Sequence, residues 1–235
     1  MNKFIFDVDG TLTPSRGVID KDFKDFFNVF CKSNHVFLVT GSDKPKTVEQ
    51  IGEDTYNLCR TVYNCNGNDV WQGKNHVRTN EWVLPLEAYN FLEKFLFESE
   101  FSLRTGLHFE NRPGMCNFSI VGRNANDIER KEYVVFDSKS NERVTIASDF
   151  NTRFPELEAK VGGETGIDIS PKGFDKSQIV KDFDPKDQLW FFGDRMDKGG
   201  NDYPLAQVVH NKREVARWQN TWEYLTWFQE QGIAQ

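Results

Sequence analysis

The chain has 235 residues, a formal net charge of −7 and 38% hydrophobic residues. Its length suffices for one large domain or two small ones, and its acidic balance argues against a protein that coats nucleic acid, because such domains are usually basic. No apolar run approaches the ~20 residues that a membrane-spanning helix needs. The amino terminus also lacks the apolar stretch of a signal peptide, so we expect a cytoplasmic protein without membrane contacts.

The cysteines and histidines do not follow a metal-binding pattern. Cys31, Cys59, Cys65 and Cys116 contain no Cys-x-x-Cys pair, which predicts free, mostly buried thiols. The histidines are scattered without a His-Glu-x-x-His pattern, which argues against a zinc hydrolase.

The first third of the chain predicts alternating strands and helices. The phenylalanines between residues 20 and 30 recur three and four apart, as in a helix that packs on a sheet. On such patterns we expect strands at 3–6, 35–39 and 61–63, and helices at 20–30 and 45–51. This alternation favours a parallel sheet with right-handed crossovers.

The pattern changes near Thr79. We expect a helix at 84–97, strands at 104–110, 115–121 and 143–147 with a helical or irregular stretch between them, a short helix at 156–161 and a strand at 165–170. This composition suggests an inserted α+β module, with residues 171–174 as the return hinge. The predicted fold is therefore α/β: a Rossmann-like parallel-sheet core formed by residues 1–78 and 175–235, with an α+β cap domain at 79–174.

The last part of the chain predicts a return to the core domain. Residues 178–182 are helical in pattern, and 188–192 form an apolar strand that ends in Gly193-Asp194. Apolar side chains from Val215 to Phe228 then recur at helical spacing, which favours packing against the sheet.

Two carboxylates follow the first strand. Residues i and i+2 of an extended segment point to the same side, so we expect Asp7 and Asp9 to face one cleft. Like charges so close raise each other's pKa unless a cation lies between them. A turn, a metal site and an acid/base pair all remain open at this point.

Other polar groups stand at the ends of the second and last strands. Ligands of parallel α/β sheets bind at the carboxyl ends of the strands, so these groups should meet. They comprise Thr40, Gly41 and Ser42 after the second strand, Lys176 before a helix, and Asp194, Asn201 and Asp202 after the last strand. Carboxylates suit Mg²⁺, whereas a hydroxyl, loop N–H groups and an ammonium suit a phosphoryl group, and an aspartate can accept that group as a nucleophile.

These four segments resemble the motifs of the haloacid dehalogenase superfamily. The resemblance implies that Asp7 is the nucleophile and that Asp9 is the general acid/base, with its backbone carbonyl on the metal. It also implies that Asp194 completes the Mg²⁺ site with Asp7, and that Asn201 and Asp202 support the metal shell. Lys176 with Thr40 or Ser42 would hold the phosphate.

Longer stretches are similar to the eukaryotic-type α-phosphomannomutases. They include residues 7–16, 112–123 and 171–176, Gly162-Gly163 leading to Asp168, and 191–194 through 199–202. By this resemblance, Arg112, Arg123 and Arg130 of the cap grip the phosphate distant from the nucleophile, Arg16 contributes from the core, and Asp168 contacts sugar hydroxyls. Guanidinium groups suit this role because they hold phosphate bidentately. Gly166 departs from the family, which usually has serine there.

The sequence thus predicts an Mg²⁺-dependent hexose-phosphate mutase that interconverts mannose 6-phosphate and mannose 1-phosphate. The resemblance implies a hexose 1,6-bisphosphate activator, an aspartyl-phosphate on Asp7 and a homodimer paired through the cap. A sugar phosphatase of the same superfamily is the alternative, although it has no need for a second phosphate site. A non-catalytic sugar-phosphate sensor is a third reading, against which the intact pair Asp7 and Asp9 argues.

Overall fold

The computed structural model describes residues 1–15 and 17–235. The chain divides into two compact units, one formed by Met1–Asn80 with Gly173–Gln235 and the other by Glu81–Lys172. No helix in the described part of the chain is long and apolar enough to cross a membrane. The four cysteines are free and buried, as predicted.

A mostly parallel sheet forms the centre of the first unit. Its strands, among the described residues, are β1 (Asn2–Phe6), β2 (Val36–Val39), β3 (Thr61–Asn64), β4 (Asp69–Gln72), β5 (Asn75–Thr79), β10 (Gln188–Gly193) and β11 (Asn211–Glu214). They lie in the order β11-β10-β1-β2-β3-β4-β5, parallel from β11 to β3 and antiparallel over the last two pairs. The predicted parallel sheet is confirmed. The β4–β5 hairpin and strand β11 were not predicted.

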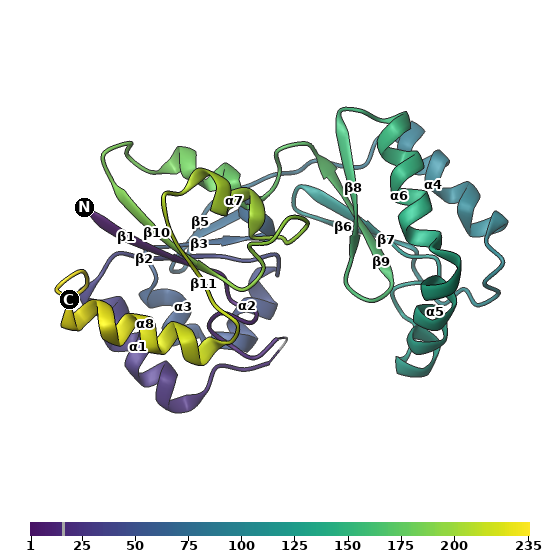
Figure 1. Cartoon of the computed structure of the whole chain (residues 1–235). Coiled ribbons are helices and arrows are strands. Elements are labelled where there is room, and N and C mark those ends of the chain that lie inside the picture. The colour runs from purple at the N-terminus through teal and green to yellow at the C-terminus, as the bar shows by residue number, and fades with distance from the viewer. Residues whose placement is uncertain (16) are drawn as a thin grey trace. The chain divides into compact units, whose positions relative to one another are not determined.

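Helices cover both faces of this sheet (Figure 1). They are α1 (Lys21–Ser33), α2 (Lys44–Ile51), α3 (Glu53–Leu58), η1 (Cys65–Gly67), η2 (Lys176–Asp182), α7 (Tyr203–Val208) and α8 (Trp218–Glu230). One core joins α1, α3 and α8 to one face of the sheet, and a second joins η2 and α7 to the other. Phe6 stacks on Phe192 at 4.8 Å and meets Phe27 edge-on at 5.3 Å. Such aromatic pairs add about 0.5–1.5 kcal/mol each beyond area burial.

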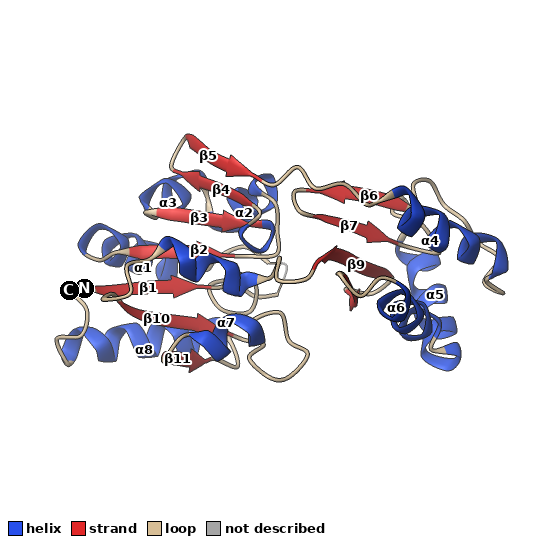
Figure 2. Cartoon of the chain, turned by 90° about the horizontal axis from the view of Figure 1, so that it is seen from above, coloured by secondary structure: helices blue, strands red, loops and turns tan. Residues whose placement is uncertain are grey.

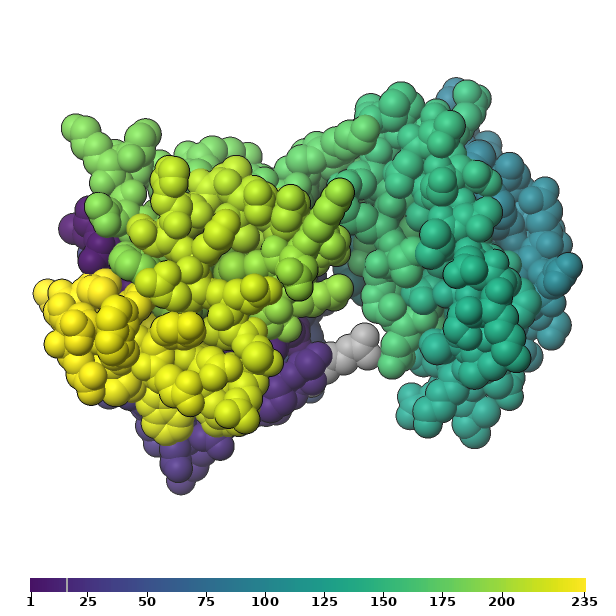
Figure 3. Space-filling view, in the orientation of Figure 1, coloured from purple at the N-terminus to yellow at the C-terminus, as the bar shows by residue number. Residues whose placement is uncertain are grey.

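The two chain ends lie close together in the first unit (Figure 1). The Asn34 side-chain amide donates to the carbonyl of Gln235 at 2.7 Å, and that of Asn2 donates to Ile233 at 2.9 Å. Figure 3 shows the C-terminal segment, in yellow, spread over much of the visible face of this unit. The segment after the C-terminal helix is thereby tied to the end of α1 and to the start of β1, the strand that precedes Asp7.

The second unit pairs an antiparallel sheet with helices. Its strands are β6 (Phe109–Arg112), β7 (Met115–Phe118), β8 (Leu157–Gly162) and β9 (Gly166–Pro171), in the order β6-β7-β9-β8. Its helices are α4 (Leu86–Glu98), α5 (Asp127–Ser140) and α6 (Glu142–Arg153). The helices lie on one face of the sheet (Figures 1 and 2), where Phe118, Ile167 and Ile169 are buried. This unit is the inserted cap.

Two predicted elements of the cap were wrong, and a third begins later than predicted. Residues 143–147, predicted as a strand, lie in α6, where Ile146, Ala147 and Phe150 are buried at helical spacing. The carboxylate of Asp137 accepts from the backbone N–H of Arg143 and thereby caps the first turn of this helix. The capping residue stands on the preceding helix, six residues before Arg143, and not at the usual N-cap position.

The predicted helix at 156–161 is strand β8, in which Leu157 and Ala159 alternate with more exposed residues. Charged neighbours hid this period of two. The predicted strand at 104–110 begins only at Phe109, because the Arg104 guanidinium turns back to donate to the carbonyl of Leu96 at 2.7 Å.

Candidate active site

The register of the core sheet brings the predicted strand ends together. Phe6 pairs with Phe192 on one side and with Leu38 on the other. The backbone N–H of Asp7 donates to the carbonyl of Phe192 at 2.9 Å, so the strand-end residues Asp7 and Gly193 are neighbours. The carboxyl ends of β1, β2 and β10 therefore share one edge of the sheet.

A fully buried ion cluster lies at this edge. The Nζ atom of Lys176 is 2.6 Å from Oδ1 of Asp7 and 2.7 Å from Oδ1 of Asp202. The lysine and Asp202 side chains are 0% exposed, and that of Asp7 is 3% exposed. Burial alone would lower the pKa of Lys176, but its two carboxylate partners raise it, so the ammonium stays charged. A buried ammonium fixed on Asp7 is suited to holding a phosphoryl group there.

The Asp194 carboxylate reaches the buried ion cluster by passing directly over the backbone of Gly10. A Cβ atom at Gly10 would collide with the Asp194 carboxylate, and the φ of 74° at Gly10 also favours glycine. Gly193 serves Asp202 in the same way, since a Cβ there would lie 2.5 Å from Oδ2 of Asp202. Two glycines thus give the carboxylates the room to converge.

The acidic group fits a divalent cation. Among the described residues, Asp7, Asp194 and Asp202 form a cluster whose carboxylate oxygens lie within 4.8 Å of one another. Burial, then the charge of Asp202, raises the pKa of Asp7 to about 8 and that of Asp194 to about 6, in each case against the opposing charge of Lys176. A bound cation would relieve this repulsion, and carboxylate oxygens are ligands that Mg²⁺ prefers.

Both oxygens of the Asp202 carboxylate already accept a hydrogen bond. Its Oδ1 atom accepts from Lys176, and its Oδ2 atom accepts from the backbone N–H of Arg195 at 3.1 Å. Asp7 and Asp194 are therefore the carboxylates best placed to take a metal, while Asp202 is placed to hold Lys176 against Asp7. Asn201, the other predicted support of the metal shell, is exposed.

Asp9 lies in a different environment from Asp7. Strand β1 ends at Phe6, so the alternation of an extended strand does not carry through both aspartates. The Oδ1 atom of Asp9 accepts from the side-chain amide of Gln50 at 2.8 Å, and Gln50 is buried on α2. Asp9 is half-buried and lies outside the acidic cluster. The two carboxylates are thus available for different tasks.

The predicted phosphate-binding loop follows β2. The backbone N–H of Ser42 donates to Oγ1 of Thr40 at 3.1 Å, which folds the loop into a tight turn. Thr40 is buried and its N–H donates to the carbonyl of Tyr63, whereas Ser42 is half-buried. Ser42 is therefore the better placed of the two hydroxyl residues for a ligand.

Two of the predicted cap arginines share one carboxylate. Arg112 donates to both oxygens of Glu110, at 3.2 and 3.0 Å, and Nε of Arg123 lies 2.5 Å from Glu110 Oε2. Although burial opposes it, the hydrogen bonds and charges of the arginines lower the pKa of Glu110. The cap therefore holds two guanidinium groups close enough to bind one anion.

The third cap arginine is held by the turn between β8 and β9. Nη2 of Arg130, on α5, lies 3.1 Å from Oε2 of Glu164. Arg16, which the resemblance places in the core site, lies outside the described residues.

Asp168 belongs to a polar row across the open face of the cap sheet. Strand register aligns Glu110 with Asn117, Asn117 with Asp168, and Asp168 with Lys160. The Asn117 amide donates to Oδ1 of Asp168 at 2.6 Å. A Cβ at Gly166 would lie 2.5 Å from that amide nitrogen, so the Asn117 side chain occupies the space that a serine at 166 would need.

Sequence reasoning missed the polar partners of the site residues. Gln50, Glu110, Asn117 and Glu164 each bond a predicted site residue. The signal for Glu110 was present, because it stands two residues before Arg112 and therefore shares its face of a strand. Asn117 and Glu164 become visible only with the strand register.

The chain was compared with known proteins. A model of the eukaryotic phosphomannomutase family matches residues 23–221, a range that begins after Asp7 and Asp9. Phosphomannomutase 1 of Dictyostelium discoideum is 32% identical over 86% of this chain and 85% of its own length. The phosphomannomutase of Arabidopsis thaliana is 31% identical over 86% of each.

Solved structures agree on the fold. A haloacid dehalogenase-like hydrolase from Bacteroides thetaiotaomicron superposes with a TM-score of 0.57 at 13% identity, over 91% of this chain and 90% of that one. The α/β core with an inserted cap is thus the haloacid dehalogenase-like fold. On the match to the family model and the identity to curated relatives, this chain belongs to the eukaryotic phosphomannomutase family.

Proposed function

We propose that the chain is an Mg²⁺-dependent phosphomannomutase that interconverts mannose 6-phosphate and mannose 1-phosphate. One observation carries the proposal above all: a buried aspartate, Asp7, is held by a buried ammonium beside two further carboxylates at the ends of parallel strands. Such a group suits the transfer of a phosphoryl group, and membership of the family points to a hexose phosphate as its carrier.

Asp7 is proposed as the nucleophile. Its Oδ1 atom bonds Lys176, so attack on phosphorus falls to the other carboxylate oxygen. A new bond joins that oxygen to phosphorus while the bond between phosphorus and the sugar oxygen of hexose 1,6-bisphosphate breaks. The leaving sugar oxygen takes a proton from Asp9, and Lys176 stabilises the charge on the phosphoryl oxygens.

The phosphoryl group then passes to a hydroxyl of the substrate. Asp9, now a carboxylate, removes the proton from that hydroxyl, and the resulting bisphosphate returns its other phosphate to Asp7 after reorientation. Arg112, Arg123 and Arg130 are proposed to bind the phosphate that is not reacting. Two of them already share one carboxylate, which an incoming phosphate would compete with.

Mg²⁺ would be held by Asp7 and Asp194, beside Asp202, with the backbone carbonyl of Asp9 as the further ligand that the resemblance implies. When bound it supplies positive charge for the phosphoryl oxygens. The hexose 1,6-bisphosphate activator, pairing through the cap and a cytoplasmic location stay predictions from the sequence. The resemblance further implies that mannose 1-phosphate feeds sugar-nucleotide synthesis, as in GDP-mannose biosynthesis.

One assay tests the proposal. The protein is incubated with mannose 1-phosphate, Mg²⁺ and a trace of glucose 1,6-bisphosphate, and both mannose 6-phosphate and free phosphate are measured. We expect the 6-phosphate without stoichiometric free phosphate. Rapid release of free phosphate instead would replace the mutase with a sugar phosphatase.

The nucleophile has its own test. Asp7→Asn should lower turnover by about four orders of magnitude or more, because the amide cannot form the acyl phosphate. Asp197→Asn, at an exposed aspartate of the loop after β10, should keep full activity. Substantial turnover by Asp7→Asn would contradict the assignment of Asp7.

A further inference from the structure

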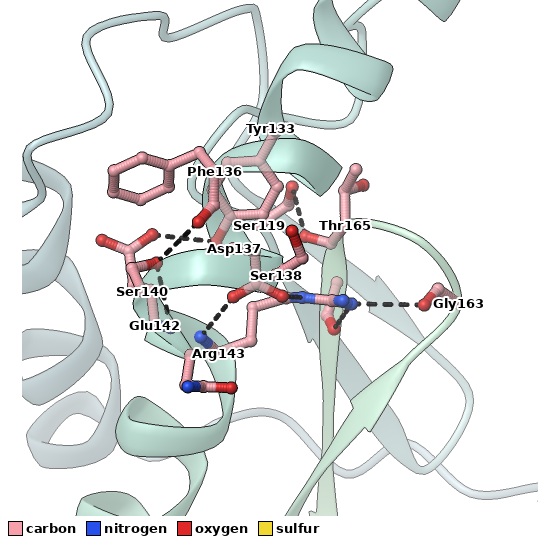
Figure 4. Close-up of polar contacts among 12 residues, drawn as sticks. Ser119, Tyr133, Phe136, Asp137, Ser138, Ser140, Glu142, Arg143, Gly163 and Thr165 are labelled. Carbon is pink, nitrogen blue, oxygen red and sulfur yellow. Dashed lines mark hydrogen bonds and ion pairs between the residues drawn. The ribbon is translucent and has the colours of Figure 1, made fainter.

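A largely buried arginine of the cap, Arg143, connects helices α5 and α6 to the turn that precedes the predicted sugar-binding residue Asp168. Nη1 of Arg143 donates to the carbonyls of Gly163 at 3.2 Å and Gly166 at 3.3 Å (Figure 4). Gly162 pairs with Gly166 at the end of the β8–β9 hairpin, so these carbonyls lie at either end of its turn. One guanidinium group therefore spans the turn.

Asp137 fixes that guanidinium in place. Its Oδ2 atom accepts from Nε of Arg143 at 2.8 Å, and its Oδ1 atom accepts from the backbone N–H of the same residue at 2.8 Å. The two side chains are only 10% and 11% exposed. Asn141 between the helices has φ of 54° and gives α6 no side-chain cap, so Asp137 takes that role as well. The arginine is thus held at its backbone and at its side chain.

The same turn contacts the segments that carry two cap arginines. Oγ of Ser119 donates to the carbonyl of Thr165 at 3.0 Å (Figure 4). It also accepts from the N–H of Gly122, directly before Arg123, at 3.2 Å. Glu164, in the middle of the turn, pairs with Arg130. The turn is therefore the common support of the segments that carry Arg123, Arg130 and Asp168.

We infer that Arg143 is a positioning residue for sugar-phosphate recognition. By holding the turn at 163–166, it sets the relative positions of Asp168, Arg123 and Arg130. The inference deepens the proposed function and rests on it for the identity of the ligand. Arg143 itself contacts backbone carbonyls and Asp137, so it acts through the turn and touches no substrate.

The test compares Arg143→Lys with Tyr133→Phe. Lysine keeps the positive charge, but a single ammonium cannot reproduce the fork of bonds to Asp137 and both carbonyls. Tyr133→Phe is the matched control, because Tyr133 is buried on α5, the helix that carries Asp137, and its hydroxyl donates to Glu142 at 2.9 Å and not to the turn. Both variants lose polar contacts at the junction of α5 and α6, but only Arg143→Lys loses the hydrogen bonds to the carbonyls of the turn.

Hydrogen exchange gives the first readout and needs no substrate. In Arg143→Lys we expect the amides at 163–166 to exchange roughly tenfold faster than in the unaltered protein, with little change in the centre of the sheet. In Tyr133→Phe the turn should exchange at the unaltered rate. Equal exchange at the turn in both variants would overturn the inference, whatever the protein's activity.

Kinetics give the second readout. The KM for mannose 1-phosphate should rise roughly tenfold or more in Arg143→Lys, because misplacement by about 1 Å is costly, while hydrolysis of acetyl phosphate, which carries no sugar, should change far less. Tyr133→Phe should keep its KM. Failure of the unaltered protein to isomerise mannose 1-phosphate would refute the proposed function, whereas an unchanged KM in Arg143→Lys alone would refute the role of Arg143.

Discussion

The core site and the cap face hold their charges in opposite ways. The core ion pairs are almost completely buried: Lys176 lies 2.6 Å from Asp7 and 2.7 Å from Asp202. These charged side chains therefore have almost no contact with solvent that could replace their partners. The side chains of Arg112 and Arg123 are 28% and 27% exposed and share Glu110. Buried charges are costly to leave unpaired, whereas surface pairs contribute little to stability.

This contrast separates two requirements of the proposed reaction. The atoms that exchange the phosphoryl group must keep one geometry, which a buried cluster supplies. The groups that bind the other end of the sugar must release a bisphosphate and accept it again in the reverse orientation. Partly exposed guanidinium groups, whose carboxylate partner can yield to phosphate, suit that exchange.

The largest effect should follow from removal of the core ammonium. Lys176→Met leaves Asp7 and Asp202 buried without their shared cation, and breaking a buried ion pair costs about 3–5 kcal/mol. We expect a correspondingly lower free energy of unfolding in urea. Asp202→Asn added to Lys176→Met should restore part of the loss, because it removes one of the two repelling carboxylates.

The matched comparison for this change is Lys160→Met on the cap. Lys160 pairs with Glu158 but is 54% exposed, so its loss should change stability by less than about 1 kcal/mol. Equal destabilisation by the two substitutions would show that the buried core cluster is no more tightly coupled than a surface pair.

The next effect concerns Mg²⁺ and pH. The raised pKa values, about 8 for Asp7 and about 6 for Asp194, mean that the cation competes with protons for these carboxylates. The folded state holds its protons more tightly than the unfolded chain, so metal-free stability should fall as pH rises from about 4 to about 8. Mg²⁺ should therefore bind more tightly at pH 8 than at pH 5.5, and at a hundred times its Kd it should stabilise by about 2.7 kcal/mol.

Thermal unfolding with and without Mg²⁺ at the two pH values measures this directly. The rise in Tm should be larger at pH 8, and it should shrink in Asp194→Asn, which removes one carboxylate of the acidic cluster. A rise in Tm that is independent of pH would place the cation elsewhere. The described residues of the cap contain no comparable group of three potential metal ligands, so substitution of Glu110 should leave the effect of Mg²⁺ on Tm unchanged.

A cap arginine should affect binding without affecting the core chemistry. Arg112→Ala should raise the KM for mannose 1-phosphate by about tenfold to a hundredfold, as expected for loss of one or two charge-assisted hydrogen bonds. The rate of acetyl phosphate hydrolysis should stay within about twofold. Arg153→Ala, at an exposed arginine in the last turn of α6, should leave both quantities unchanged. Equal losses on both substrates in Arg112→Ala would contradict the division of labour between core and cap.

The two units also differ in how well the sequence predicted them. The core alternates short apolar strands with amphipathic helices, and its polar strand ends meet as the pattern predicts, because parallel strands bring those ends to one edge. In the cap, a β-branched run such as Val144-Thr145-Ile146 forms a helix because Asp137 caps it from another helix. The arginines were predicted from the family resemblance, and Glu110 could have been inferred from its place two residues before Arg112, but the pairing of Asn117 with Asp168 depends on cross-strand register, which no local pattern encodes.

The smallest effect should come from the position at which the chain departs from its family. A serine at 166 would need the space now taken by the Asn117 amide, which donates to Asp168. The atoms in the way belong to the Asn117 side chain and not to the backbone, so they can rotate away. The bond from Asn117 to Asp168 would then be lost, while the new serine hydroxyl offers a donor in its place.

Gly166→Ser should therefore change the KM for mannose 1-phosphate by only about threefold, with kcat less affected. The ratio of KM values for mannose 1-phosphate and glucose 1-phosphate is the sensitive measurement, because the resemblance places Asp168, the partner of Asn117, on the sugar hydroxyls. Asn117→Ala separates the two contributions: if Asn117 orients Asp168, this variant should raise the KM more than Gly166→Ser does, and the reverse order would show that the space above Gly166, and not the amide bond, determines how the cap binds its sugar.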